Sequence, residues 1–289
     1  MAIEKDEFKN AFRKNICSNV PFGNNGFQYS RRVVFDVERE KKITKRCIQR
    51  PLGVDELHIS PKNMKSFLVV GASRGIGASV TQHLIEQGHS VVGVSRTKPP
   101  AGEWIQADVS THDGISMVCE AIGDRPLDGF LYLGGVWEEG AFTDAFSFEN
   151  SSDAETRFVL SVNLIAPIEL SRGIAKNLAL TESPRAIFIG ALSGLDHSAT
   201  HEVANSASKF GLRGAIQALR LVYRRKNIGF TVINPGNLAT LEVLKDIEEG
   251  RFPEQAPIPL GDLCKTIDWL LSLSALTEVG DVNLSQKSG

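Results

Sequence analysis

From Lys65 onward, the chain alternates between short apolar runs and longer amphipathic segments. Ser66–Val70 ends in a glycine and is almost wholly apolar, as expected for a strand buried on both faces of a parallel sheet. A helical pattern follows from Ile76 to Glu86 and is stopped by Gly88. Further strands are predicted at Ser90–Val94, Trp104–Ala107, Gly129–Leu133, Ala186–Ile189, Phe230–Ile233 and Val282–Leu284. Helix-length segments separate most of them, notably Ala154–Asn177, Val203–Lys226 and Leu260–Leu273.

This order of elements predicts an α/β protein. Strands that alternate with helices form right-handed βαβ units, and such units build a doubly wound parallel sheet with helices on both faces. We therefore expect a single domain of this kind over residues 65–289.

Residues 1–64 follow neither pattern. They hold turn-forming clusters at 21–26 and 50–53 and one short strand candidate, Arg32–Val37. Residues 1–65 carry 14 Lys and Arg against 8 Asp and Glu, although the whole chain has a net charge of −2. We predict a basic, partly ordered N-terminal extension that packs on the main domain or on a partner subunit. Docking to an acidic protein, or less readily to nucleic acid, is the alternative, and no motif with interleaved aromatic residues favours nucleic acid.

Composition narrows the class of protein. The chain has 289 residues, 42% hydrophobic and 23% charged, which is ordinary for a globular protein and argues against disorder, collagen and coiled coil. The longest apolar runs, such as Phe67–Val70 and Trp269–Leu271, are far shorter than the roughly 18 to 20 residues that cross a bilayer. The acidic N-terminus does not fit a signal peptide. The four cysteines form no CxxC pair, so we expect neither a metal site nor disulfides, and a cytoplasmic location.

A glycine-rich segment, Gly71–Gly77, lies between the first strand and the first helix. Glycines let the backbone approach a dinucleotide pyrophosphate closely, and the start of a helix attracts its charge. A tight turn without a ligand is the simpler alternative. The second strand ends in Val94-Ser95-Arg96, without the carboxylate that binds the ribose diol of NAD. Arg74 and Arg96 suit a 2′-phosphate, so NADP(H) is the predicted cofactor unless both arginines are merely solvated.

Several motifs in this order resemble the short-chain dehydrogenases/reductases, over about residues 65–285. The glycines of Gly71–Gly77 have that family's spacing, and Asp108-Val109 resembles the pair that lies against the adenine. Asn163 matches the helix asparagine that supports the catalytic water chain. Ser208-Lys209 resembles the end of the Tyr-x-x-x-Lys motif, whose lysine also holds the nicotinamide ribose.

The resemblance implies a Rossmann-like fold and a set of cofactor contacts. Asn234-Pro235-Gly236 matches the segment beside the nicotinamide, and Thr240 is placed to contact its carboxamide. The implied cofactor-binding residues are Gly71, Ser73, Arg74, Gly75, Ile76, Gly77, Ser95, Arg96, Asp108, Val109, Gly134, Lys209, Pro235, Gly236 and Thr240.

Three positions around the implied catalytic pocket depart from the family's pattern. The tyrosine that donates the proton is replaced by Asn205, and its partner serine by Ala191. The Asn-Ala-Gly segment after the fourth strand reads Leu133-Gly134-Gly135. A carboxamide can orient a carbonyl group by hydrogen bonding but does not titrate near neutral pH. Lys209 keeps its cofactor-binding role without the tyrosine, so cofactor binding and catalysis are separable here.

Other side chains are candidates for the missing acid. His201 lies one helical turn before Asn205 and titrates near neutrality, which makes it the best substitute, although an exposed loop histidine is the simpler interpretation. Ser193 lies two residues beyond the serine position and is otherwise a turn residue. His197 and Tyr132 also border the predicted pocket, as do the less informative Trp137, Glu138 and Glu139. The candidate catalytic set is therefore Lys209, Asn163, Asn205, His201 and Ser193.

Two hypotheses for the function follow. The first is a divergent NADP(H)-dependent oxidoreductase that transfers hydride to a small molecule carrying a carbonyl, an imine or an activated C=C bond. The second is an inactive NADP(H)-binding relative that serves as a partner subunit or redox sensor. A nucleic-acid binder is a distant third, and we expect neither a nucleic-acid nor a membrane partner.

The family resemblance also implies a homo-oligomer. The segments 154–177 and 203–226 correspond to the helices that build the family's dimer interface. Their apolar positions supply core and interface faces together, or core alone: Phe158, Val162, Ile165, Ile168, Phe210, Leu212, Ile216 and Leu219.

Overall fold

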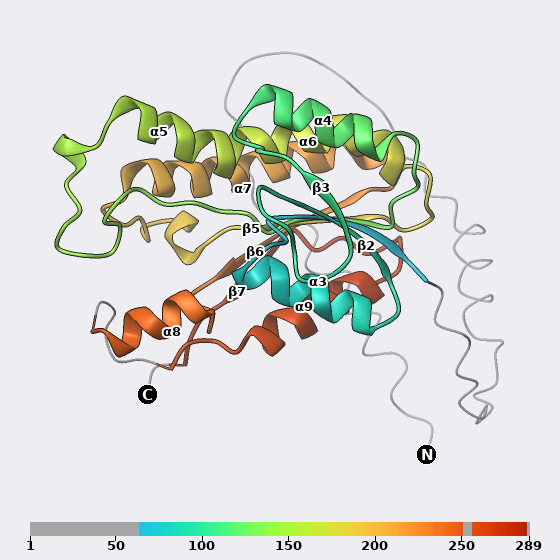
Figure 1. Cartoon of the computed structure of the whole chain (residues 1–289). Helices are drawn as coiled ribbons and strands as arrows, with labels where there is room; N and C mark the ends of the chain where they lie inside the picture. Colours follow the sequence, from blue (N-terminus) through green and yellow to red (C-terminus); the bar gives the residue numbers. More distant parts are fainter. Residues whose placement is uncertain (1–63, 251–255, 288–289) are drawn as a thin grey trace, which may run out of the picture. The chain divides into compact units, whose positions relative to one another are not determined.

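The computed structural model describes residues 64–250 and 256–287, all within one unit of the chain, Ile59–Gly289. Seven parallel strands form one sheet in the order β3-β2-β1-β4-β5-β6-β7 (Figure 1). In chain order they are β1 (Ser66–Val70), β2 (Ser90–Ser95), β3 (Glu103–Gln106), β4 (Gly129–Tyr132), β5 (Arg185–Ile189), β6 (Gly229–Pro235) and β7 (Asp281–Leu284). The predicted doubly wound parallel sheet is confirmed.

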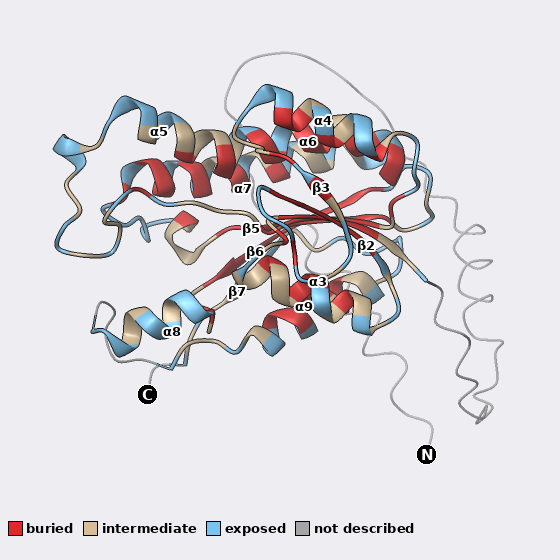
Figure 2. Cartoon of the chain, viewed as in Figure 1, coloured by how far each residue is buried: buried red, intermediate tan, exposed pale blue. Residues whose placement is uncertain are grey.

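Helices cover both faces of the sheet (Figure 1). They are α3 (Gly75–Glu86), α4 (His112–Ile122), α5 (Asp153–Leu160), α6 (Ala166–Leu178), α7 (Val203–Tyr223), α8 (Leu241–Glu248) and α9 (Leu260–Ser272). Because successive strand residues point to opposite faces, Leu68 and Val70 pack with α4, α6 and α7, whereas Phe67 and Val69 pack with α3 and α9. Figure 2 shows the buried strands between these two layers.

Most predicted elements begin and end within one or two residues of the observed ones. The exceptions are α4 and α8, which the sequence pattern did not predict. Helix α4 contains a glycine near its start and relies on Thr111, whose hydroxyl accepts a hydrogen bond from the Gly114 N–H at 3.1 Å. Helix α8 has only eight residues and buries none of them, so it is too short to show a sustained helical period.

The predicted helix at Ala154–Asn177 consists of three pieces. Helix α5 runs into a π-helical turn, η2 (Ser161–Ile165), and then into α6. Such turns interrupt α-helices frequently at functional sites. Asn163 lies in this turn and is buried, so the distortion coincides with a predicted site residue.

The same run meets the length and composition criterion for a membrane span, and the expectation that the chain has no such span stays a prediction. Among the described helices, Asp153–Leu178 is long and apolar enough to cross a membrane by length and composition alone, and half of its most apolar stretch is buried inside the domain. The sequence expectation considered only uninterrupted apolar runs, whereas this helix is amphipathic. A core helix of a globular domain meets the same criterion.

Two expectations fall outside the described residues. The basic extension over residues 1–64 and its strand candidate at Arg32–Val37 lie almost wholly within residues 1–63. The division of the chain near residue 64 therefore stays a prediction.

Candidate active site

The carboxyl ends of the central strands place four loops side by side. Strands β1 and β4 are neighbours, and so are β5 and β6, so their following loops meet at one edge of the sheet. At Gly71, a Cβ atom would lie 2.6 Å from the Gly134 N, and at Gly190 it would lie 2.2 Å from Asn234 Oδ1. The loops therefore approach so closely that only glycine fits. Ligands of open α/β sheets bind at this edge, where the strand order reverses.

The loop after β1 has the features of a phosphate cradle. Gly71 and Gly75 have φ values of 87° and 52°, which favour glycine, and the Gly71 N–H donates to the Val94 carbonyl at 2.9 Å. A Cβ at Gly77 would lie 2.0 Å from the Gly71 carbonyl oxygen. Within α3, the N-cap Arg74 provides no side-chain cap and the first turn has no acidic residue. The start of α3 thus offers its N–H groups to an anion, so these residues fit a dinucleotide pyrophosphate.

The end of β2 and the loop after β3 lie beside this cradle. Ser95 is buried and its hydroxyl donates to the Thr97 carbonyl at 2.7 Å, while Arg96 is exposed. Burial acts to raise the pKa of Asp108, but hydrogen bonds from Ser110 and the charge of Arg96 outweigh it, and the pKa lies below its ordinary value. Arg96 therefore lies close to Asp108 and still faces solvent. Val109 packs against the core beneath α4.

The predicted lysine and helix asparagine meet at the loop after β4. Lys209 is 4% exposed, and its Nζ donates to the Ile189 carbonyl at 3.2 Å. A Cβ at Gly135 would lie 3.8 Å from both Lys209 Nζ and Asn163 Oδ1. Burial lowers the pKa of Lys209 to about 8, because an ammonium group loses its hydration there. The structure therefore brings Lys209 and Asn163 together at the edge of the sheet.

Asn205 faces the same loop. It is 1% exposed, and its Nδ2 donates to the Val136 carbonyl at 3.3 Å. That carbonyl also accepts from Asn163 Nδ2 at 2.8 Å, and Asn163 Oδ1 accepts from the Val136 N–H at 3.0 Å. Ser208 joins the two asparagines, because its hydroxyl donates to the Asn205 carbonyl at 2.6 Å and lies 3.3 Å from Asn163 Nδ2. The Asn205 amide is thus engaged with the backbone.

The other candidate acids lie at different depths. His201 and His197 are exposed, and His197 has a φ of 62°. Ser193 is half-buried in a 3-10 turn, Leu192–Gly194, that packs against the stem of Lys209. Tyr132 is buried, and its hydroxyl donates to the Val162 carbonyl at 2.5 Å. Burial raises the pKa of Tyr132 above its ordinary value, so this phenol is held by packing rather than poised for proton transfer.

The loop after β6 closes the other side of the edge. Pro235 ends β6, and the Gly236 N–H donates to the Leu284 carbonyl at 2.8 Å. Thr240 is 9% exposed and caps α8, its hydroxyl accepting from the Val243 N–H at 3.3 Å. A Cβ at Gly75 would lie 3.8 Å from both Thr240 Cγ2 and Glu242 Oε2. The start of α8 therefore lies against the glycine loop.

Two buried glutamates are functional candidates that the sequence pattern did not single out as important. Glu138 and Glu202 are 6% and 4% exposed. Glu138 Oε1 accepts from the N–H groups of Ala204 and Asn205 at 2.7 and 3.1 Å, and Glu202 Oε1 accepts from the Phe142 N–H at 2.8 Å. A glutamate that caps a helix 66 residues further along the chain leaves no periodic signal in the sequence.

The chain belongs to the short chain dehydrogenase family, whose sequence model matches residues 65–250. It is 24% identical over 200 residues to asnovolin H dehydrogenase nvfC of Aspergillus novofumigatus. It is 28% identical over 200 residues to the short-chain dehydrogenase/reductase cdmF of Talaromyces verruculosus. Each alignment covers 65% of this chain and 75% of the relative. These names give no support to the hypothesis of an inactive relative.

Solved structures have the same fold. L-sorbose reductase from Gluconobacter frateurii, complexed with NADPH and L-sorbose, has a TM-score of 0.66 at 17% identity and covers 78% of this chain and 98% of its own. A 4-hydroxyisoleucine dehydrogenase complexed with NADH has a TM-score of 0.64 at 22% identity and covers 77% of this chain and 97% of its own. Both nicotinamide cofactors thus occur among proteins of this fold.

Glu242 should weaken dinucleotide binding, because its carboxylate lies beside the positive start of α3. We expect Glu242→Gln to tighten binding of NADPH by roughly two- to fivefold, the size of a helix-dipole interaction at an exposed site. Calorimetric titration at low and high salt measures this, and the gain should shrink at high salt. Glu248→Gln, an exposed position at the other end of α8, is the matched control. Unchanged or weaker binding by Glu242→Gln would contradict the prediction.

Proposed function

We propose that this chain is an NADP(H)-dependent oxidoreductase that reduces a small molecule carrying a carbonyl, an imine or an activated C=C bond. The observation that carries the proposal is the buried Lys209 beside Gly135 and Asn163, next to a glycine loop that fits a pyrophosphate. When bound, the cofactor supplies a hydride to the electrophilic carbon. Lys209 would then hold the ribose hydroxyls, and the start of α3 the pyrophosphate.

We propose further that the active site is atypical, with Asn205 and Ala191 in place of the family's tyrosine and serine. Reduction of a C=O bond consumes one hydride and one proton, and the Asn205 amide has no proton to give at neutral pH. An iminium carbon accepts hydride without a proton from the enzyme. For a carbonyl or an activated C=C bond, the proton would come from His201 or from water.

The cofactor preference is supported by charge. Arg96 is exposed at the end of β2 and lies near Asp108. We expect calorimetry to give tighter binding of NADPH than of NADH. Arg96→Ala should weaken NADPH binding by roughly 10- to 100-fold and leave NADH unchanged, because a charge-assisted hydrogen bond contributes about 1.5–3 kcal/mol. Arg172→Ala, an exposed arginine of α6, is the control. Equal affinities of the wild type for NADPH and NADH would contradict the predicted role of Arg96 at the 2′-phosphate. A wild type that binds neither cofactor would overturn the proposed function.

We also propose that the protein is a homo-oligomer. Of the apolar positions on the two long helices, Val162, Leu212 and Ile216 are buried, whereas Ile165, Ile168 and Phe210 are exposed. The exposed side chains would form the interface between copies. Sedimentation velocity should find a dimer or tetramer at micromolar concentration, and Ile168→Glu should dissociate it. Leu276→Glu, at a fully exposed position, should not. A monomeric wild type would contradict this prediction.

A cytoplasmic setting is part of the same proposal. Its support is that Cys119 and Cys264, the cysteines within the described residues, are both free thiols.

A further inference from the structure

The segment from Gly135 to Phe142 begins inside the candidate active site. Gly135 lies against Lys209 Nζ and Asn163 Oδ1. The next residue, Val136, bonds through both its N–H and its carbonyl to Asn163, and through its carbonyl to Asn205. This end of the segment is therefore fixed on the residues to which we assign cofactor binding and catalysis.

Two carboxylates join the rest of the segment to the start of α7. One comes from the segment and the other from the residue before the helix. Glu138 reaches from the segment to the N–H groups of Ala204 and Asn205, while Glu202 reaches from the helix side to the Phe142 N–H. Both side chains are more than nine-tenths buried. Three hydrogen bonds from backbone N–H groups to these carboxylates therefore join this wall of the site to the start of α7.

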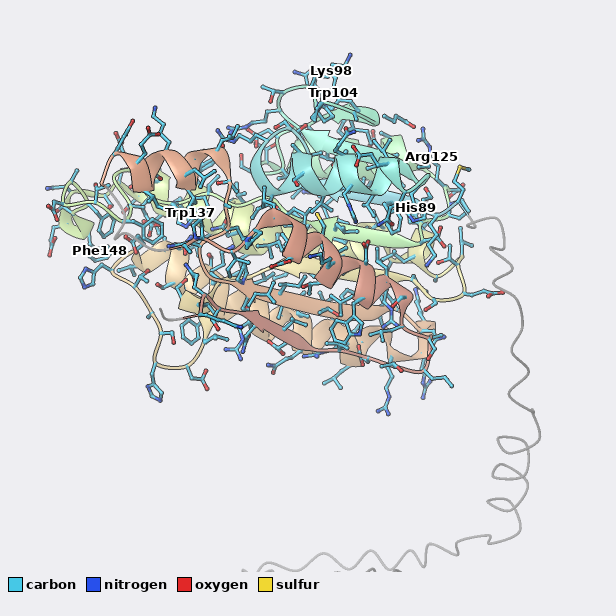
Figure 3. All side chains as sticks on the ribbon, turned by 90° about the horizontal axis from the view of Figure 1, so that it is seen from below. His89, Lys98, Trp104, Arg125, Trp137 and Phe148 are labelled. Carbon is cyan, nitrogen blue, oxygen red and sulfur yellow. The ribbon has the colours of Figure 1, made fainter. Side chains whose placement is uncertain are left out.

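This segment leaves two large aromatic side chains in solvent. Trp137 is 53% exposed and Phe142 is 39% exposed, and their rings contact edge to face with centroids 6.3 Å apart. Trp137 stands between Val136, which bonds to Asn163 and Asn205, and Glu138, which bonds to the start of α7, so its backbone is fixed at the edge of the candidate site. Figure 3 shows Trp137 at the same end of the domain as Phe148, away from His89 and Arg125.

The backbone at Phe142 is strained. Its φ is 63°, a conformation that is rare for a bulky residue. Such strain persists only where surrounding contacts enforce it, and here the Glu202 carboxylate binds the Phe142 N–H. The chain thus maintains an unfavourable backbone conformation that keeps a phenyl ring next to the exposed indole.

At the same end of the sheet, helix α8 also presents apolar side chains. Leu241 is 84% exposed and Leu244 is 45% exposed, and the start of α8 contacts the glycine loop at Gly75. Figure 1 shows α8 and the connection between β4 and α5 at the same end of the sheet. Apolar surface therefore occurs both on this segment and on α8, at the same end of the sheet.

We propose that Trp137 and Phe142 form the substrate-binding face of the active site, and that the substrate carries its reducible group on an apolar ring system. An aromatic pair offers a ring a large contact surface, whereas a polyol would lose hydration there without gaining hydrogen bonds. This inference rests on the proposed function, because it takes the site beside Lys209 to be the site of reduction.

The test compares two ketone probes that differ in apolar area, 2-decalone and dihydroxyacetone, in the presence of saturating NADP⁺ so that no turnover occurs. Calorimetry should show 2-decalone binding at least tenfold more tightly to the wild type. Trp137→Ala and Phe142→Ala should each weaken the binding of 2-decalone by about tenfold and leave the Kd of NADPH unchanged. Trp137→Phe, which keeps an aromatic ring, should retain most of the affinity.

Trp269 provides the matched control, since it is 47% exposed but lies on α9. Trp269→Ala should leave 2-decalone binding unchanged. In addition, 2-decalone should quench the tryptophan fluorescence of Trp269→Phe but not that of Trp137→Phe.

Three results would overturn the inference: equal affinity for the two ketones, tighter binding of dihydroxyacetone, or undiminished 2-decalone binding by Trp137→Ala and Phe142→Ala. These results are distinct from a failure of the proposed function, which would appear as a wild type that binds neither NADPH nor NADH. Melting temperatures of the variants close to that of the wild type would show that any loss of binding is local.

Discussion

Replacing Asn205 by tyrosine together with Ala191 by serine should raise NADPH-dependent reduction of simple ketones by roughly 10²- to 10⁴-fold, the usual contribution of general acid catalysis. The change would place a phenol four residues before Lys209, on the buried face of α7. Burial already lowers the pKa of Lys209 to about 8, and its ammonium in turn would lower the pKa of a neighbouring phenol. Asn163 lies close to this position, because its amide and that of Asn205 donate to the same Val136 carbonyl.

The single variants separate the two contributions. Asn205→Tyr alone should give most of the gain, because it supplies the proton, whereas Ala191→Ser alone should give little. Adding Lys209→Met to the double variant should abolish the gain and weaken NADPH binding. His201→Ala should leave the gain intact, yet it should remove the wild-type activity if His201 is the native acid. The rates are measured by NADPH absorbance against ketones, imines and enones.

Rapid ketone reduction by the wild type that survives His201→Ala would contradict this interpretation. It would mean that the proton comes from a group other than those assigned here. A double variant that is folded, binds NADPH and is no faster than the wild type would show that Asn205 does not occupy the position of the missing phenol.

Gly77→Ala should destabilise the domain by about 3 kcal/mol and remove dinucleotide binding. Its Cβ would lie 2.0 Å from the Gly71 carbonyl oxygen and 2.6 Å from the carbonyl carbon, so the backbone of the glycine loop must move. Overpacking costs typically about 1–3 kcal/mol, and a clash with backbone belongs at the upper end. The free energy of unfolding is measured by urea denaturation, and cofactor binding by calorimetry.

Gly214→Ala is the matched control, because it is also a helical glycine but has open space where its Cβ would lie. It should stabilise the domain by about 0.5–1 kcal/mol, the difference in helix propensity between the two residues. If both variants had similar stability, or if Gly77→Ala still bound NADPH with wild-type affinity, the close approach at Gly71 would not be essential.

The sheet was predictable because its five central strands are buried on both faces and therefore have short, largely apolar sequences. The glycine loop was predictable for a related reason: its glycines are required by positive φ angles and by backbone contacts, which no other residue permits. Helix α8 escaped prediction because it is short and has no fully buried residue. Burial and backbone constraints can thus be predicted from the sequence pattern, whereas an element that has neither is difficult to predict.

The candidate site was predictable only in part. Lys209, Asn163 and Asn205 were identified through the family resemblance, and they lie around Gly135 and Val136. What the resemblance did not reveal is the pair of glutamates that joins the segment after β4 to the start of α7. Glu138 and Ala204 are brought together by the crossover connection, so their contact depends on the three-dimensional path of the chain and on no local pattern.

The π-helical turn at Ser161–Ile165 changes the direction in which side chains point around the axis of one long helix. An α-helix advances by about 100° per residue, so a turn that holds one extra residue rotates everything before it relative to everything after it. The stretch after the turn is phased to bury Leu170 and Ile174 against the sheet, while Asn163 within the turn is aimed at Val136. Deleting one residue here would restore an unbroken α-helix. That helix could either bury Leu170 and Ile174 or keep the contact between Asn163 and Val136, but not both. The extra residue lets the same helix pack against the hydrophobic core and also orient Asn163 in the candidate active site.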